Sequence, residues 1–189
     1  MKILPELTSG PTSEPLSLSE AKKHLEIAVS DTTHDIQLAQ AIQEAREQWE
    51  SDTDSVCCYQ TYRIRTQSLF DSFRLQKLPI QSIVSITYFD GNNQSQTLSS
   101  TIYQLHVDEI RLAYQKTLPV TASRWDAWTI NYRCGYSQDA TLVPAIAKRA
   151  MLLLVGHYFE NRDMLMSEAI QTLKPYEALV LRYMRSSYP

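Results

Sequence analysis

The first third of the chain places apolar residues at helical spacing. Ser17-Leu18-Ser19-Glu20 has the form of a capping box, in which a serine and a glutamate satisfy free N–H groups at a helix start. The buried stripe of this short helix is predicted at Leu18, Ala21, Leu25 and Ala28. A longer helix is predicted from Thr32 to about Trp49, with its stripe at Leu38, Ile42, Ala45 and Trp49. Two amphipathic helices joined by a short polar turn predict an αα-hairpin.

The pattern changes to a period of two in the middle of the chain, where Val, Ile, Thr, Tyr and Phe are frequent. Asp90-Gly91-Asn92-Asn93 has the composition of a hairpin turn. In the last segment of this region Trp128, Ile130 and Tyr132 alternate with polar residues. Strands are expected at residues 59–66, 83–89, 96–98, 103–107, 109–112 and 127–134, with a short continuation at 69–75. These segments predict a small antiparallel sheet.

A helical pattern returns at Val143-Pro144, where proline suits the first turn of a helix. From residue 145 to about 161 apolar residues cover more than half of the circumference, which is typical of a helix that is either central to the domain or packed on two partners at once. A last helix begins at Lys174-Pro175. Surplus apolar side chains on these two helices are candidate contacts with other subunits: Met151, Val155, Phe159, Tyr176, Leu179, Val180 and Tyr183.

The order of elements is two helices, a run of strands and two helices. Segregation of this kind predicts the α+β class: a helical bundle, made of the N-terminal αα-hairpin and the C-terminal helices, with an inserted small antiparallel β region. Three prolines and a glycine make residues 1–16 an expected extended arm. Residues 17–162 form the expected main domain, and 163–189 a C-terminal helix and tail. Within the main domain we expect helices over 17–50, the β region over 57–135 and a helix over 144–161.

Composition and charge disfavour several classes of function. Four glycines in 189 residues leave little room for glycine-rich phosphate loops. The net charge of −3 divides into −7 over residues 1–56 and +3 over 57–135, and the sequence has no evident basic patch for duplex DNA. Cys57, Cys58 and Cys134 predict free, buried or half-buried thiols rather than a disulfide framework. In a strand the adjacent pair would point to opposite faces.

Targeting signals are not evident in the sequence. The N-terminal residues lack the apolar run of a signal peptide. The longest apolar run, residues 150–155, is far shorter than the roughly 20 residues that a membrane-spanning helix needs. We therefore expect a protein that is made and kept in a cytoplasm-like setting, with no membrane partner.

Candidate chemistry is sparse. His157 and Glu160 have the i, i+3 spacing of helical metal sites, but no second motif supplies the remaining ligands, so no metal is expected. Nucleophile elbows, phosphate loops and Cys-x-x-Cys pairs are missing, and we expect no cofactor, no catalytic residue and no enzyme activity. Trp125 and Trp128 suggest either a stacking platform for bases or sugars, or a structural pair. The second is favoured, with Trp128 in the sheet core and Trp125 over a loop or a subunit contact.

Several short sequence motifs occur along the chain in a recognisable order. They are Leu16 to Leu25 (LSLSEAKKHL), Gln60 to Arg63 (QTYR), Leu78 to Tyr88 (LPIQSIVSITY), Tyr132 to Tyr136 (YRCGY), Val143 to Ile146 (VPAI) and His157 to Arg162 (HYFENR). This series resembles the head–tail connector (adaptor) proteins of tailed phages, whose relatives also occur in prophages and gene-transfer agents. Cys134 departs from the family pattern, where a small or apolar residue is more usual.

The resemblance implies a structural role in a virion. Such proteins form a ring, usually a dodecamer, on the portal protein at the capsid vertex. The ring extends the DNA channel, lets DNA pass without specific binding, and offers a docking platform for neck or tail completion proteins. The expected location is the neck between capsid and tail, after assembly in the host cytoplasm. The family has a helix bundle with a smaller β region and no catalytic residues.

Two other functions remain open from the sequence. A binding module would recognise a peptide or a nucleic acid through the β region and its Trp and Tyr side chains. A small hydrolase would assemble a site from residues far apart in the chain. Ring formation or co-purification with a portal protein separates the connector from both alternatives.

Overall fold

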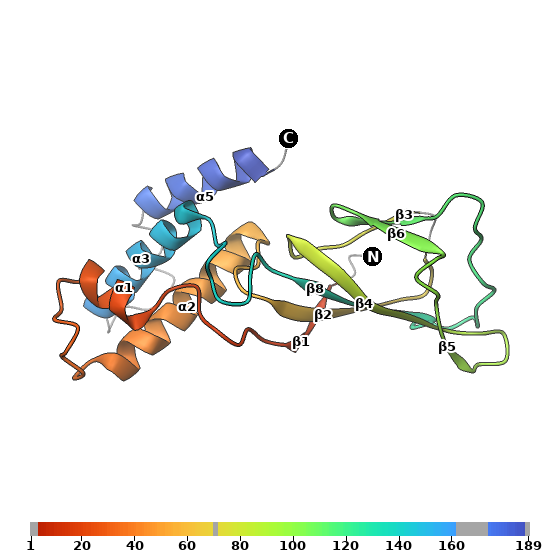
Figure 1. The fold of residues 1–189 in the computed structure, drawn as a ribbon, viewed down its shortest axis with the longest axis horizontal. Helices are drawn as coiled ribbons and strands as arrows, with labels where there is room; N and C mark the ends of the chain where they lie inside the picture. Colours follow the sequence, from red (N-terminus) through yellow and green to blue (C-terminus); the bar gives the residue numbers. More distant parts are fainter. Residues whose placement is uncertain (1–3, 70–71, 162–173, 188–189) are drawn as a thin grey trace. The chain divides into compact units, whose positions relative to one another are not determined.

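The computed structural model describes residues 4–69, 72–161 and 174–187 (Figure 1). The chain divides into two compact units. The first, called the β unit, comprises residues 1–11 and 59–136. The second, called the helical unit, comprises residues 12–58 and 137–189. Within the described ranges no helix is long and apolar enough to cross a lipid bilayer.

The helices of the helical unit follow the predicted segments, except that the first helix ends at His24, so that Ala28 of its predicted stripe lies beyond it and is exposed. They are α1 (Leu18–His24), α2 (Asp35–Thr53), α3 (Ala145–Glu160) and α5 (Lys174–Ser187). The capping box is confirmed, because the Glu20 N–H donates to Ser17 Oγ at 3.1 Å and the Ser17 N–H donates to the Glu20 carboxyl group at 2.8 Å. Helix α2 packs against α3 and α5 (Figure 1). The predicted stripe of α2 is confirmed, since all four of its members are buried: Leu38, Ile42, Ala45 and Trp49.

A buried ionic cluster ties the segment before α1 to α2. The Arg46 guanidinium donates to Glu14 at 2.8 Å and lies 3.4 Å from the carboxyl group of Glu50. Glu50 in turn accepts the backbone N–H of Cys57 at 2.9 Å. Because the buried cation meets carboxyl groups on two sides, its desolvation is compensated. The cluster therefore fixes the segment before α1 and the segment that follows α2 against the α2 helix.

The β unit contains two antiparallel sheets. The first has five strands in the order β1-β2-β8-β4-β5, and the second has three strands in the order β3-β7-β6 (Figure 1). The strands are β1 (Glu6–Ser9), β2 (Gln60–Thr66), β3 (Ser72–Arg74), β4 (Ile80–Phe89), β5 (Ser95–Thr97), β6 (Tyr103–His106), β7 (Glu109–Leu112) and β8 (Trp128–Cys134). The predicted hairpin at residues 90–93 is confirmed, since it joins the paired strands β4 and β5.

Aromatic side chains fill the inner face of the five-stranded sheet. Tyr62 stacks on Tyr132 with ring centroids 6.1 Å apart, and Tyr88 contacts Trp128 at 5.1 Å. The predicted inward position of Trp128 is confirmed. Such ring pairs contribute about 0.5–1.5 kcal/mol beyond the area that they bury. The Tyr132 hydroxyl group also donates to the Gln76 carbonyl at 2.8 Å, which ties the segment after β3 to this face.

The expected architecture, a helical bundle with a small inserted β region, is wrong. Within the described residues the eight strands form two sheets, so the β unit is a compact body with its own core rather than a small insertion. Two features could not be read from the sequence. The segments at 69–75, 103–107 and 109–112 were expected in one small sheet with the others, but β3, β7 and β6 pair with one another to form a second sheet. The segment Glu6–Ser9 adds an edge strand although its side chains are all exposed.

The cysteines are free and buried, as expected, but the geometric argument for Cys57 and Cys58 was wrong. It assumed a strand, where neighbouring side chains point to opposite faces. The pair instead lies in the irregular stretch that follows α2, where this alternation does not apply, and both side chains are fully buried. Burial raises the pKa of the Cys57 thiol well above its usual range, which keeps it protonated and unreactive.

Candidate interaction surfaces

The seven predicted subunit-contact residues fall into two groups in the helical unit. Met151, Val155, Tyr176 and Tyr183 are buried within the unit's own core. Phe159, Leu179 and Val180 are half-buried. Their role in contacts between subunits stays a prediction, and the second group has surface left for a neighbour.

Two buried tyrosines hold α5 in place. The Tyr176 hydroxyl group donates to the Asp52 carboxyl group at 2.6 Å, and the Tyr183 hydroxyl group is hydrogen-bonded to Ser55 Oγ at 2.7 Å. Both partners lie at the end of α2 or directly after it. These tyrosines therefore position α5 against α2 and are accounted for by the fold.

The outward side of α5 carries apolar residues that were not among the predicted contacts. Leu181 is 57% exposed, and Met184 is exposed as well. At 100° per residue Leu181 lies on the side opposite Tyr176 and Tyr183, and Met184 lies between the two sides. A plot of the helical positions around these two tyrosines could have found them. The outward side of α5 is therefore an apolar surface that one copy leaves open to solvent.

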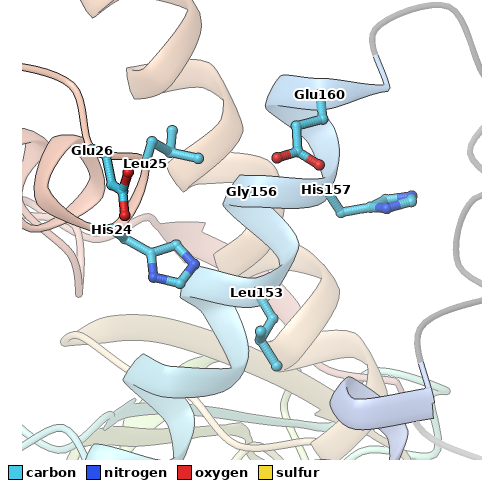
Figure 2. A pocket seen from close by; sticks show the side chains of 7 residues that line it. All are labelled: His24, Leu25, Glu26, Leu153, Gly156, His157 and Glu160. Atoms are coloured by element: carbon cyan, nitrogen blue, oxygen red, sulfur yellow. The ribbon is translucent and has the colours of Figure 1, made fainter.

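An open polar pocket lies between the end of α1 and the last turns of α3 (Figure 2). Its volume is about 460 Å³. A methyl group at Gly156 would lie 3.7 Å from Nε2 of His24, an ordinary van der Waals contact, so this side of α3 comes close to the end of α1. Figure 2 shows the Glu160 carboxyl group reaching over the opening from α3, with Glu26 next to His24 on the opposite side. Two carboxyl groups and an imidazole thus line one opening.

The spacing of His157 and Glu160 does not bring their side chains together. Figure 2 shows the His157 ring pointing away from Glu160. The side-chain amide of Asn161 instead donates to His157 Nδ1 at 3.2 Å and to the His157 carbonyl at 3.0 Å. In the described part of the chain no group of three or more His, Cys, Asp or Glu side chains is arranged to hold a metal ion.

Trp125 of the β unit is 70% exposed, in contrast to the buried Trp128. Its neighbour Arg124 is held on three sides: by Asp126 at 2.8 Å, by Asn93 at 2.9 Å, and by the ring of Phe89, whose centroid lies 3.8 Å away. Hydrogen bonds from Arg124 lower the pKa of the Asp126 carboxyl group, so this pair stays ionised. The exposed indole is therefore presented from a fixed backbone.

The outer face of the five-stranded sheet gathers three arginines. Arg63 and Arg65 alternate out of β2, and Arg133 comes from the neighbouring strand β8. The register pairs Arg63 with Asn131 and Arg133 with Thr61, so all three side chains share one face. The alternation of buried and exposed residues is visible within each segment of the sequence. The arginine cluster is not, because the pairing of segments about 70 positions apart cannot be read from either segment alone.

Comparisons with known proteins bear on the fold. No protein-family model and no curated protein matches the chain. Solved structures do match. A chain in the neck of an empty GTA particle, computed with C6 symmetry, superposes with a TM-score of 0.76 at 17% identity, over 94% of both chains. The chain has the fold of a phage-like neck protein.

Two further structures agree. A chain in the virion of the native gene transfer agent (GTA) particle gives a TM-score of 0.74 at 18% identity, covering 95% of this chain and 94% of the other. A chain in the neck of the native GTA particle, computed with C12 symmetry, gives 0.70 at 17% identity, covering 97% and 94%. Identities this low establish the fold alone. They support the resemblance found in the sequence at the level of a neck protein, without fixing a particular family.

Proposed function

We propose that this chain is a structural subunit of the neck of a phage-like particle, a head–tail connector that joins copies of itself into a ring on the portal protein. The observation that carries the proposal is the match to a GTA neck chain over 94% of both chains. Two of the matched structures were computed with C6 or C12 symmetry, which supports a ring of repeated copies, and twelve is the number that we propose.

A closed ring requires two different surfaces on each subunit, because head-to-tail contacts join unlike faces. The outward side of α5 is one apolar candidate, and the half-buried Phe159, Leu179 and Val180 extend the choice within the helical unit. Trp125 is a candidate in the β unit, since an exposed tryptophan is a typical energetic centre of a protein interface once a partner covers it. These surfaces are the candidate contacts with other copies of the chain, with the portal protein and with a tail completion protein.

The proposed role is mechanical rather than catalytic. The ring extends the DNA channel and offers a platform for the next protein of the neck, while DNA passes without specific binding. The helical unit carries fifteen Asp and Glu against nine Lys and Arg, a net charge of −6, which disfavours adhesion of DNA. The location in the virion neck agrees with the structures that share the fold.

Electron microscopy of the purified chain mixed with its portal protein tests the proposal. An added ring on the portal is expected, and native mass spectrometry should give a mass near twelve copies. Leu181→Asp should reduce ring formation, whereas Arg182→Asp, on a different side of the same helix, serves as the matched control. A chain that remains monomeric and ignores both portal and tail proteins under assembly conditions contradicts the proposed function.

A further inference from the structure

The outer face of the five-stranded sheet carries a cluster of cations. We call Arg63, Arg65 and Arg133 the arginine face. The positions next to them in the register are small and polar: Thr61, Thr129 and Asn131 from β2 and β8, and Ser82, Ser85 and Thr87 from the adjoining strand β4. Because these positions offer little apolar area, the function of this face depends on charge.

The cations of this face are only partly satisfied within the chain. Arg65 lies 3.2 Å from Glu6 of β1. Arg63 donates one N–H to Asn131 at 3.2 Å, and Arg133 lies over the ring of Tyr59 at 5.9 Å. Among the residues that the structure describes, neither Arg63 nor Arg133 has an ion-pair partner. Two guanidinium groups are thus open to an external anionic group.

A surface of opposite charge exists on the same chain, in the helical unit. The outward side of α2 carries Glu44 and Glu47, which we call the acidic face, and α2 contains no other cation than the buried Arg46. Glu44 has no ion-pair partner in the described ranges, and Glu47 is 57% exposed although it lies 3.3 Å from Arg46. Glu47 also accepts a hydrogen bond from the Gln43 side-chain amide at 3.0 Å, so Glu44 is the carboxyl group of the acidic face that is more open to an external cation.

A hollow beside Glu44 has a shape suited to a cation. Its volume is about 190 Å³, and it lies between α2 and the end of α3. The lining residues are Gln37, Gln40, Ala41, Glu44, Tyr158 and Phe159. A guanidinium group prefers this combination, because it bonds carboxyl and amide oxygens in its plane and stacks on aromatic rings. The predicted contact residue Phe159 thus adjoins the acidic face.

We propose that the arginine face of one copy docks on the acidic face of the next copy, with an arginine side chain entering the hollow beside Glu44. This inference rests on the proposed ring, since it names the contact by which neighbouring copies meet. The partner is a second copy because the charges of the two units are complementary. The β unit has nine Lys and Arg against six Asp and Glu, net +3, whereas the helical unit is net −6.

The same observations make DNA the weaker partner for the arginine face. Arg65 is already paired with Glu6, which leaves about two guanidinium groups per copy to neutralise phosphates. Arginine is, by contrast, enriched in interfaces between proteins. Complementary charge also selects one orientation of the subunits, since two like faces repel each other.

A charge-swap experiment tests the contact. The sheet variant Arg63→Glu/Arg133→Glu and the helix variant Glu44→Arg/Glu47→Arg should each weaken self-association at least tenfold, measured by sedimentation velocity at low and high salt. An equal mixture of the two should restore assembly, because each reversed face then meets a complementary face on its neighbour. Lys116→Glu, an exposed charge outside both faces, should assemble like the wild type. Circular dichroism confirms that each variant is folded.

Each outcome decides the inference. Restored assembly in the mixture supports the contact. If the sheet variant and the helix variant each assemble like the wild type, the contact is overturned and the proposed ring is left intact. A mixture of the two variants that stays dissociated has the same meaning. Loss of binding to a 30-base-pair duplex in the sheet variant, with self-association unchanged, assigns the arginine face to DNA and overturns the contact. A wild-type chain that forms no ring, with or without portal protein, overturns both proposals.

Discussion

The helical unit and the β unit use their polar groups in opposite ways. The helical unit buries them, as in the cluster of Arg46 with Glu14 and Glu50. The β unit fills its interior with rings and keeps its ion pairs at the surface, as between Arg65 and Glu6. Buried charges tolerate few alternative arrangements, whereas exposed charges contribute little to folding.

This difference separates the tasks that the two units can perform. A unit whose segments are fixed by buried charge keeps one geometry, which suits the repeated part of an assembly. In a sheet whose outer charges are not needed for stability, those charges can be changed to match a neighbouring subunit. Four substitutions test this comparison, from the largest expected effect to the smallest.

Trp49→Ala should destabilise the protein most. Trp49 is fully buried and contacts the Tyr183 ring edge-on at 5.0 Å, so its removal leaves a large cavity at a cost of about 3–5 kcal/mol. Chemical denaturation measures the total. Amide hydrogen exchange, measured on individual peptides, should show a loss of protection in α2, α3 and α5.

Trp49→Phe is the matched control. The indole N–H of Trp49 is buried and has no hydrogen-bond partner in the described part of the chain, so phenylalanine loses no such bond. The expected cost is about 1–2 kcal/mol, from lost packing alone. Equal losses for the two variants would contradict the assignment of Trp49 to the packed core.

Arg46→Met should cost roughly 3 kcal/mol, because it leaves the Glu50 carboxyl group buried without its cation. The double variant Arg46→Met/Glu50→Gln should recover part of this loss, since it also removes the uncompensated charge. Denaturant titration of both variants checks the pair. A single variant as stable as the wild type would show that the helical unit does not depend on its buried charges.

Ser17→Ala should cost about 1 kcal/mol through the capping box. Burial by itself would raise the pKa of Glu20, but hydrogen bonds from Ser17 and the charge of Lys148 outweigh it and lower the pKa below its usual 4.5. A lowered pKa stabilises the fold above about pH 4.5 and loses this effect as the pH falls through the folded-state value. Thermal melts from pH 3 to 6 should therefore show a weaker acid dependence in Ser17→Ala and in Glu20→Gln.

Glu6→Gln should change stability by less than about 0.5 kcal/mol, because it removes a pair in which both side chains are substantially exposed. Denaturation at 20 mM and 500 mM salt provides the measurement. A loss comparable with that of Arg46→Met would abolish the distinction between the two units.

The helical unit was the more predictable of the two. The stripe from Leu38 to Trp49 and the capping box at Ser17 are local patterns, and the structure confirms both. The β unit was underestimated, because the strand Glu6–Ser9 owes its place to the pairing of Glu6 with Arg63, about 57 positions away. No local propensity encodes that pairing.

The candidate surfaces divide in the same way. The predicted contacts on α3 and α5 stay a prediction, and spacing alone does not tell a core residue from a contact residue, since Met151 and Tyr176 lie in the core. The arginine face required the register of β2 against β8, and the hollow beside Glu44 required the packing of α2 on α3. Both arise from tertiary structure.

The chain passes from one unit to the other three times, near residues 11, 58 and 136. Neither unit is therefore encoded by an uninterrupted stretch of the gene. Recombination with a single breakpoint inside the coding region would join mismatched halves of both cores, so exchange between related genomes is expected to transfer the whole reading frame. A single protease cut at any one crossing would likewise leave the two units covalently linked.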